Sequence, residues 1–301
     1  MEFFDNNYLR TSIGFVLGSI IGSFLNVCVT RIPQGVSIIV PGSACPRCNK
    51  KINWFNNLPI ISWMLLNGRA SCCEFKIPFR YFLVELSTAL IFGFLFLMQN
   101  DFKSWGLLVS GMFFVTFLVV IIAVDYETMI IPDRFSIGGA FLGLIFSYCF
   151  PSLHGFSDEP LLIERISAFF TAMLGLLISS AVLYWTGAIA ERLMGKEALG
   201  QGDIKLLGFI GAFCGWQGGV FVIFGGAVIG TALLVPVMIY KKFFGSRYAA
   251  TNEDNIDWGM EVPFGPFLGI AALLYFLGIR DLVEDWFEGI ISNFMLMFSA
   301  L

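Results

Sequence analysis

Two aspartates at the edges of apolar segments are the residues of this chain best suited to do chemistry. Asp125 follows the apolar run 114–124, and Asp203 opens another run within the sequence Leu-Gly-Gln-Gly-Asp-Ile-Lys at 199–205. Two carboxylates that lie side by side share one proton, so that one activates a water molecule while the other polarises a carbonyl group. The pair therefore predicts the chemistry of an aspartic peptidase, which needs neither a metal ion nor a nucleophilic side chain.

Three neighbours of Asp203 are candidates for contact with a substrate. Gly200 and Gly202 lack a Cβ atom, which lets a substrate backbone lie close to the carboxylate, and Lys205 places a cation beside it. The alternative is a structural role, in which Asp203 caps a helix and Asp125 is a solvated charge at a helix end. Either aspartate alone favours that role, whereas both on one face of a membrane favour catalysis.

Four other polar residues are assigned ordinary roles. His154, the only histidine, is expected in a loop on the opposite side of the membrane, which excludes Ser-His and Cys-His catalysis near the aspartates. Asp133 follows a proline and precedes an apolar run, which is typical of a helix start. Asn26 and Glu85 are expected to be buried and to hydrogen-bond across helices.

The elements that must position the aspartates are membrane-spanning helices. Of the 301 residues, 57% are hydrophobic and 13% are charged, and the mean hydropathy is +0.80. Soluble domains carry about 25% charged residues, so we expect an all-α polytopic membrane bundle of about eight transmembrane helices. The net charge of −4 gives no indication of nucleic-acid binding. The apolar runs lie at 12–30, 81–99, 106–124, 135–151, 166–188, 204–216, 218–239 and 263–279.

The basic residues predict the orientation of this bundle. With eight helices, one side of the membrane receives 14 of the 18 Lys and Arg residues, and the side richer in them is cytoplasmic in most membrane proteins. Asp125 and Asp203 both fall at helix ends on that side, so the two carboxylates can meet. The acidic C-terminal tail then lies outside, with both termini.

The segment 31–80 is the largest soluble part and holds four of the seven cysteines, namely Cys45, Cys48, Cys72 and Cys73. Cytoplasmic thiols stay reduced, and Cys45-Pro-Arg-Cys48 is a turn of the kind that presents two thiolates to one metal ion. The segment is thus either a zinc site or a small reduced loop held by packing. The expected domains are a first transmembrane segment (1–30), a cytoplasmic cysteine-containing loop domain (31–80) and a peptidase membrane domain (81–301).

A series of short motifs extends along nearly the whole chain. They are GSFLNV at 22–27, RIP at 31–33, CPRC at 45–48, NLPIISW at 57–63, RY at 80–81, VEL at 84–86, DYETMIIPD at 125–133, GKEALGQGDIKLL at 195–207 and PFGP at 263–266. In this order they resemble the type IV prepilin peptidases, which belong with the GxGD aspartic proteases of membranes.

The resemblance implies a function. Such enzymes remove the short basic leader of type IV prepilins or type II secretion pseudopilins, after a glycine, on the cytoplasmic side of the bacterial inner membrane. Asp125 and Asp203 occupy the catalytic positions. Many members also methylate the new N-terminal residue with S-adenosylmethionine, and the cytoplasmic loop is the segment associated with that activity. No motif for S-adenosylmethionine is recognisable in the sequence, so no residue is assigned to it. The expected partners are the prepilin or pseudopilin and the lipid bilayer.

The loop departs from the pattern of the family, which often has a second C-x-x-C pair. Here the chain reads Ala70-Ser71-Cys72-Cys73, with Cys73 at the last thiol position and Ala70 in place of the first. A zinc site of four thiolates therefore requires Cys72 to supply the missing ligand.

Two rival functions differ in kind from a peptidase. In a multi-spanning transporter, the same aspartates would relay protons or bind cations. Transporters often consist of two related halves, and no such internal symmetry is visible here. In a membrane-anchored metal-binding module, the cysteine loop would be the functional part, and replacement of its cysteines would abolish the function.

Overall fold

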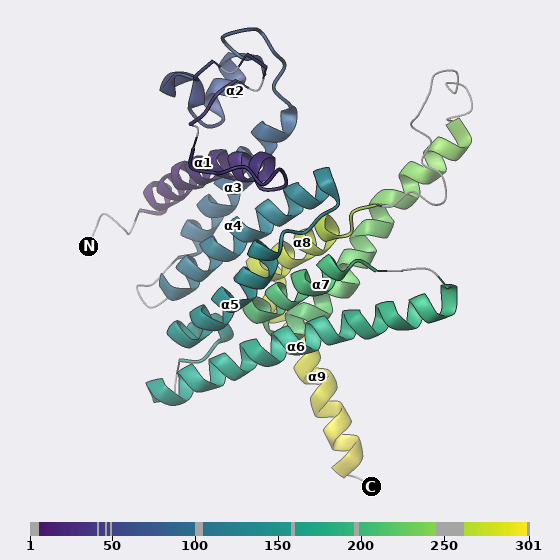
Figure 1. Cartoon of the computed structure of the whole chain (residues 1–301). Helices are drawn as coiled ribbons and strands as arrows, with labels where there is room; N and C mark the ends of the chain where they lie inside the picture. Colours follow the sequence, from purple (N-terminus) through teal and green to yellow (C-terminus); the bar gives the residue numbers. More distant parts are fainter. Residues whose placement is uncertain are drawn as a thin grey trace.

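The computed structural model describes residues 6–40, 42–45, 47–48, 50–99, 105–157, 160–195, 199–244 and 262–299. Within these ranges the chain is helical, with two isolated β-bridges and no strand, so the all-α prediction is confirmed. Figure 1 shows long helices packed into one bundle, with α9 projecting from it. The helices are α1 (Asn7–Arg31), η1 (Trp54–Asn57), α2 (Ile61–Leu65), α3 (Phe79–Met98), α4 (Trp105–Thr128), α5 (Asp133–Cys149), η3 (Pro151–His154), α6 (Leu161–Met194), α7 (Gln201–Phe244), α8 (Gly265–Leu274), η5 (Tyr275–Ile279) and α9 (Arg280–Ser299).

All eight predicted spans overlap helices of the structure. By length and composition, six helices of the described residues can cross a membrane, and the chain is therefore a polytopic membrane protein. The difference in number has two sources. Helix α5, with 17 residues, is at the lower limit of spanning length, and the sixth and seventh predicted spans are two helices, on either side of a break at Gly215, that are counted together as α7. The last predicted span also continues further than expected, because η5, a π-helical turn, joins α8 to α9 without a break and the acidic residues after position 280 are helical.

Helix α7 reverses its direction at Gly215. This residue has φ 70° and ψ −179°, a conformation that glycine adopts far more easily than other residues. Gly211 and Gly219, four residues on either side, both lie against Ser179 of α6, where a Cβ atom at either glycine would clash with the serine. The two arms of α7 therefore run side by side along α6, and Asp203 stands at the start of the first arm.

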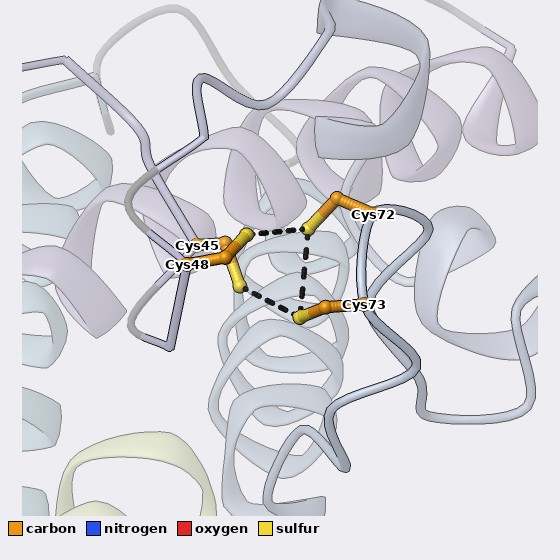
Figure 2. Close-up of side chains that lie close together, drawn as sticks. All are labelled: Cys45, Cys48, Cys72 and Cys73. Carbon is orange, nitrogen blue, oxygen red and sulfur yellow. Dashed lines mark hydrogen bonds between the residues drawn. The ribbon is translucent and has the colours of Figure 1, made fainter.

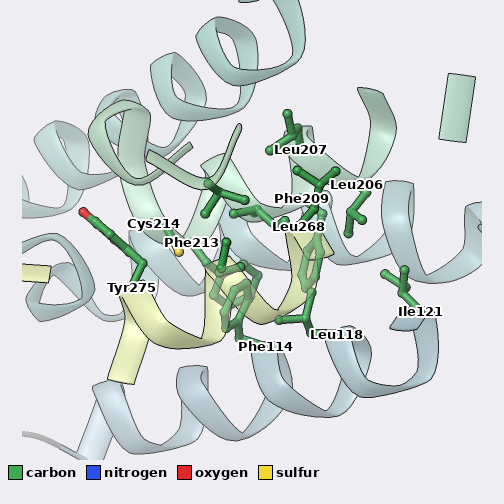
Figure 3. Close-up of a cluster of buried hydrophobic side chains, with 14 of the residues drawn as sticks. Phe114, Leu118, Ile121, Leu206, Leu207, Phe209, Phe213, Cys214, Leu268 and Tyr275 are labelled. Atoms are coloured by element: carbon green, nitrogen blue, oxygen red, sulfur yellow. The ribbon is translucent and has the colours of Figure 1, made fainter. Parts of the chain in front are cut away.

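The core of the bundle is organised around α4. In its most apolar stretch 61% of the residues are buried, a larger share than in any other candidate span of the described residues. One side of α4 packs against α1 and α3. The other side contributes Phe114, Leu118 and Ile121 to a cluster with Phe209 and Phe213 of α7, which Figure 3 shows. This packing fixes α4 and the first arm of α7 relative to one another, and each carries one aspartate.

Helix α1 packs on α3 through a row of small residues. Gly14, Gly18 and Gly22 follow one another at four-residue intervals, and a Cβ atom at any of them would collide with α3. Such rows let two membrane helices approach closely. The chain then leaves α1 for the loop segment 31–80, which lies beside α1 and α3 in Figure 1 and returns to the bundle at α3.

The loop segment is anchored to the bundle by a buried carboxylate. Oε2 of Glu85 on α3 accepts a hydrogen bond of 2.7 Å from the Ile60 backbone N–H, and Asn26 of α1 donates from Nδ2 to Oε1 of the same residue at 3.5 Å. The prediction that Asn26 and Glu85 hydrogen-bond across helices is confirmed. The Trp63 ring also packs on Phe82 of α3, with ring centroids 5.0 Å apart. The start of α2 is thus held against the membrane helices.

Candidate active site

Asp125 lies in the last turn of α4 and is 5% exposed. The backbone of Gly265, at the start of α8, lies against its carboxylate. A Cβ atom at position 265 would overlap this carboxylate, so only glycine permits the approach of α8. The Oδ2 atom of Asp125 is buried and has no hydrogen-bond partner among the described residues. A carboxylate held in this way has an acceptor site left for a further group.

Asp203 lies in the first turn of α7 and is partly exposed. Its carboxylate accepts a hydrogen bond from the backbone N–H of Gly200, and its own N–H donates to the Gly200 carbonyl at 3.2 Å. In a capping box, the side chain of an acidic residue in the first helical turn accepts a hydrogen bond from the backbone N–H of the residue before the helix in this way. The capping role considered for Asp203 is therefore present in part, and it orients the carboxylate without closing it off.

The two aspartates line one cleft. Its volume is about 1550 Å³, and its walls come from the end of α1 and the start of the loop segment, the α4–α5 connection, the start of α7 and the residues before α8. The two carboxylates are near enough to interact electrostatically. Ile131, in the α4–α5 connection, would contact a Cβ atom at Gly202 and one at Gly265, so it lies between the segments that carry the two aspartates. The structure thus brings together two residues that are far apart in the sequence.

The three predicted neighbours of Asp203 also line this cleft. A Cβ atom at Gly200 would come within 3.3 Å of Asp203 Oδ2, whereas one at Gly202 would face Ile131 at 3.1 Å. Lys205 extends to α5, where its Nζ atom forms a salt bridge of 2.7 Å with Asp133. Asp133 was predicted to be an ordinary helix start, and it does begin α5. It also binds Lys205, the charged residue two positions after Asp203.

The four loop cysteines form a separate cluster, shown in Figure 2. Their Sγ atoms all lie within 4.8 Å of one another. The Sγ atoms of Cys45 and Cys73 are 3.5 Å apart, and those of Cys48 and Cys72 are 3.3 Å apart. Four thiolates about 2.3 Å from one zinc ion are separated by about 3.8 Å. The donor set therefore fits a tetrahedral zinc site, with Cys72 in the place of the ligand missing at Ala70.

Two closed turns present these cysteines. A β-bridge between Ala44 and Lys51 closes the first turn, and one between Arg69 and Lys76 closes the second. In the second turn Glu74, which follows the two adjacent cysteines, has a left-handed conformation with φ 53°. The adjacent residues Cys72 and Cys73 do not have the C-x-x-C spacing, which was the only sequence signal for metal binding, so this second turn was not predicted.

The thiols differ in their affinity for protons. Hydrogen bonds from the backbone N–H groups of Cys48 and Arg47 lower the pKa of Cys45 to about 6, which favours its thiolate. The hydrogen bond with Cys48 raises the pKa of Cys72 to about 12, so Cys72 keeps its proton when no cation is bound. Thiolates are the metal-binding form of cysteine, and a bound cation would displace the proton of Cys72.

His154 lies at the end of the bundle opposite to the cleft, as the sequence analysis predicted. It ends η3, and its Nε2 atom is hydrogen-bonded to Ser147 Oγ at 2.9 Å. Nearby, Arg280 donates to the carbonyl of Leu153 at 2.6 Å and to Glu284 at 2.8 Å. These contacts connect α5, η3 and α9 and include neither aspartate.

The residues that sequence reasoning missed are those brought to the site by folding. Gly265 was noted only as part of a motif, and its contact with Asp125 joins residues 140 positions apart. The start of the loop segment was not expected at the cleft, although residues 35–39 line it. A glycine flanked by prolines at the start of an apolar run was the one local signal for Gly265.

Comparisons with known proteins agree with this arrangement. Residues 16–99 match the profile of the bacterial peptidase A24 N-terminal domain, and residues 112–235 match that of the type IV leader peptidase family. The second range contains Asp125 and Asp203, and the first contains the cysteine cluster. No solved structure matches the chain with significance.

Curated proteins similar to the chain are named prepilin leader peptidase/N-methyltransferase. One from Aeromonas hydrophila is 30% identical and covers 96% of this chain and 96% of its own length. One from Klebsiella pneumoniae is 34% identical, covering 70% of this chain and 87% of its own length. One from Pseudomonas aeruginosa is 30% identical, covering 87% and 88%. The chain belongs to the type IV leader peptidase family.

Proposed function

We propose that this protein is a membrane aspartic endopeptidase that removes the leader peptide of type IV prepilins or pseudopilins and then methylates the new N-terminus. The observation that carries the peptidase activity is the placement of Asp125 and Asp203 on one cleft, with an unpartnered buried oxygen on Asp125. The relatives named above carry out both reactions according to their names. The same names give no support to a proton-coupled or cation-coupled transporter.

The proposed chemistry uses the pair as acid and base. One carboxylate removes a proton from a water molecule, whose oxygen attacks the carbonyl carbon of the scissile peptide bond. The other carboxyl group, protonated, donates a hydrogen bond to the carbonyl oxygen and then supplies the proton for the departing amine. The cleft at the helix ends gives an extended peptide and water access to both groups.

The second activity requires S-adenosylmethionine as methyl donor, as the names of the relatives imply. When bound, this co-substrate supplies an electrophilic methyl group for the free amine. No residue of the described part of the chain is assigned to it. We propose that the protein lies in the bacterial inner membrane with its cleft facing the cytoplasm. We also propose three domains: a first transmembrane segment (1–30), the loop domain (31–80) and the peptidase membrane domain (81–301).

A purified protein in detergent tests both activities with one substrate. A prepilin is incubated with and without S-adenosylmethionine, and the mass of the product is measured. Loss of the leader in both samples, with one methyl group added only when S-adenosylmethionine is present, supports the proposal. Leader loss without any methyl group refutes the methyltransferase alone, and an intact prepilin refutes the peptidase.

The orientation can be tested with the native cysteines. Cys149 is exposed at the end of α5 opposite to the cleft, whereas Cys48 and Cys72 are exposed in the loop segment. A thiol reagent that does not cross membranes should label Cys149 in intact spheroplasts and the loop cysteines only after permeabilisation. The reverse order of labelling would place the cleft outside.

We also propose that the cysteine cluster binds one zinc ion with a structural role. The spacing of the four Sγ atoms supports this. Protein purified without chelator should contain about one zinc per chain by elemental analysis, and Cys48→Ser should lose it while Cys149→Ser keeps it. Because the cluster lies outside the cleft, cleavage by Cys48→Ser should persist. Equal zinc content in both variants would exclude the site.

A further inference from the structure

An exposed apolar segment forms part of the wall of the catalytic cleft. It comprises residues 36–40, here called the strap, which follow α1 and read Val-Ser-Ile-Ile-Val. Val36, Ile38 and Ile39 line the same cleft as the two aspartates, and Ile39 is 81% exposed. Large aliphatic side chains beside a polar catalytic pair leave apolar surface in contact with water unless a ligand covers it.

The strap is held in place by a residue at the end of α1. Arg31 donates from Nη1 to the carbonyl of Ser37 at 3.1 Å and from Nη2 to the carbonyl of Gly42 at 3.3 Å. The Val36 N–H donates to the Arg31 carbonyl at 3.0 Å. The guanidinium therefore bonds the chain near the start of the strap and again two residues beyond its end.

Three of the five backbone N–H groups of the strap donate hydrogen bonds within the chain. The Ser37 hydroxyl accepts from the N–H groups of Ile39 and Val40, at 3.3 Å and 3.4 Å. The Val36 N–H and the Ser37 carbonyl are also used, and the apolar side chains of Ile38 and Ile39 line the cleft, where a ligand can contact them.

A second part of the cleft lining is apolar too. Met129 and Ile130, in the connection between α4 and α5, are 54% and 60% exposed and line the cleft. Met129 has φ 53°, and its N–H donates to the Asp125 carbonyl at 2.8 Å. This tight turn follows directly on the aspartate, so the second apolar wall is tied to the catalytic residue.

We infer that the strap and the Met129–Ile130 turn together bind the apolar side chains of the substrate next to the scissile bond. The occupant is an extended peptide that places the apolar residues following its scissile bond against the strap and the Met129–Ile130 turn, with the scissile bond at Asp125 and Asp203. The inference rests on the proposed peptidase function and names what this site recognises. It also makes the loop segment, which carries the strap, part of the peptidase site.

Kinetics with a matched pair of variants test the role of the strap. Ile39→Ser should raise KM for a prepilin about ten-fold, the effect of losing one buried aliphatic contact, and leave kcat within about two-fold. Leu65→Ser is the control, because Leu65 is 77% exposed in the same loop segment but does not line the cleft. It should change neither constant. An unchanged KM for Ile39→Ser would overturn the inference.

A substrate variant shows whether the contact is direct. Replacing the apolar residue beside the scissile bond of the prepilin by serine should weaken binding to the wild-type enzyme. With Ile39→Ser the same replacement should have much less effect, because contacting residues are not additive. Fully additive effects would show that the strap acts elsewhere.

Photo-cross-linking separates this inference from the proposed function and from contact with lipid. A photoreactive residue at position 39, in an Asp125→Asn background that leaves the substrate uncut, should cross-link to the prepilin near its cleavage point, and one at position 65 should not. Cross-links from position 39 to lipid alone would overturn the inference. A wild-type enzyme that does not cleave would overturn the proposed function, whatever the strap binds.

Discussion

Two polar clusters at opposite ends of the helix bundle, the aspartates of the cleft and the residues around Arg280, hold their groups differently. At the cleft, Asp125 buries an oxygen atom that has no hydrogen-bond partner among the described residues, and apolar side chains stand exposed around it. At the opposite end, Arg280 donates to Glu284 and to the Leu153 carbonyl, and Tyr275 donates from its hydroxyl to Glu284 at 3.0 Å. Satisfied buried networks stabilise a fold, whereas an unsatisfied buried group in a cleft indicates a ligand.

The role of a carboxylate in this protein depends on which end of the bundle it occupies. Carboxylates are present at both ends, but their partners differ. The carboxylates of the cleft interact with one another, while Glu284 interacts with Arg280 and Tyr275. Substitutions at the cleft should therefore affect activity, and substitutions at the opposite end should affect stability.

The largest expected effect comes from the catalytic pair. Asp125→Asn or Asp203→Asn removes the acid or the base, and cleavage should fall by roughly 10³-fold or more. Thermal unfolding in detergent should be little changed, because asparagine keeps the shape of the side chain. The control is Asp281→Asn on α9, which should leave cleavage intact. Processing by either active-site variant would end the assignment.

The next effect is on stability at the opposite end. Arg280→Ala removes the donor of the Leu153 carbonyl and one of the two donors of Glu284, and we expect a loss of about 2–3 kcal/mol in the free energy of unfolding. The melting temperature should drop by several degrees, while kcat for the folded protein stays as in the wild type. A drop in kcat with unchanged stability would contradict the division between the two ends.

One contribution to the pH dependence of stability arises at that end. Burial, with the Arg280 guanidinium next to it, lowers the pKa of His154 from 6.5 to about 3. The imidazole is neutral in the folded protein but binds a proton in the unfolded chain below pH 6.5, so the contribution of His154 to stability falls as the pH falls. Between about pH 6.5 and about pH 5 this contribution should fall by about 2 kcal/mol, measured as the difference between the wild type and His154→Gln.

His154→Gln provides the control for this dependence. Glutamine does not titrate, so chemical unfolding of this variant should vary less with pH over the same interval. Because His154 is the only histidine, no other imidazole contributes. Identical slopes for the two proteins would show that His154 is protonated in the folded state.

The smallest effect concerns the salt bridge at the mouth of the cleft. Lys205 and Asp133 are 36% and 60% exposed at their side chains, and exposed pairs contribute about 0–1 kcal/mol. Lys205→Gln and Asp133→Asn should thus change stability very little. If Lys205 contacts substrate, as predicted, Lys205→Gln should raise KM and Asp133→Asn should not. Equal kinetics for the two variants would assign Lys205 to the salt bridge alone.

The sequence was sufficient for features that repeat locally. Apolar runs of spanning length predicted the helices, and the basic residues and the spacing of apolar segments put Asp125 and Asp203 at the same end. The approach of Gly265 to Asp125 and the pairing of Lys205 with Asp133 depend on contacts between distant segments, which no local pattern encodes. The two apolar runs 204–216 and 218–239 predicted a break near Gly215, but not the reversal of direction, because a glycine in an apolar run does not reveal its φ angle.

The reversal at Gly215 has a consequence for how the protein enters the membrane. The first arm of α7, from Gln201 to Cys214, has 14 residues. At about 1.5 Å per residue it is roughly 21 Å long, shorter than the apolar core of about 30 Å. An arm of this length inserts poorly alone, so both arms must partition into lipid together as a hairpin. The aspartate at its start reaches its partner only after residues beyond 216 have been synthesised, and no nascent chain that ends earlier is an active protease.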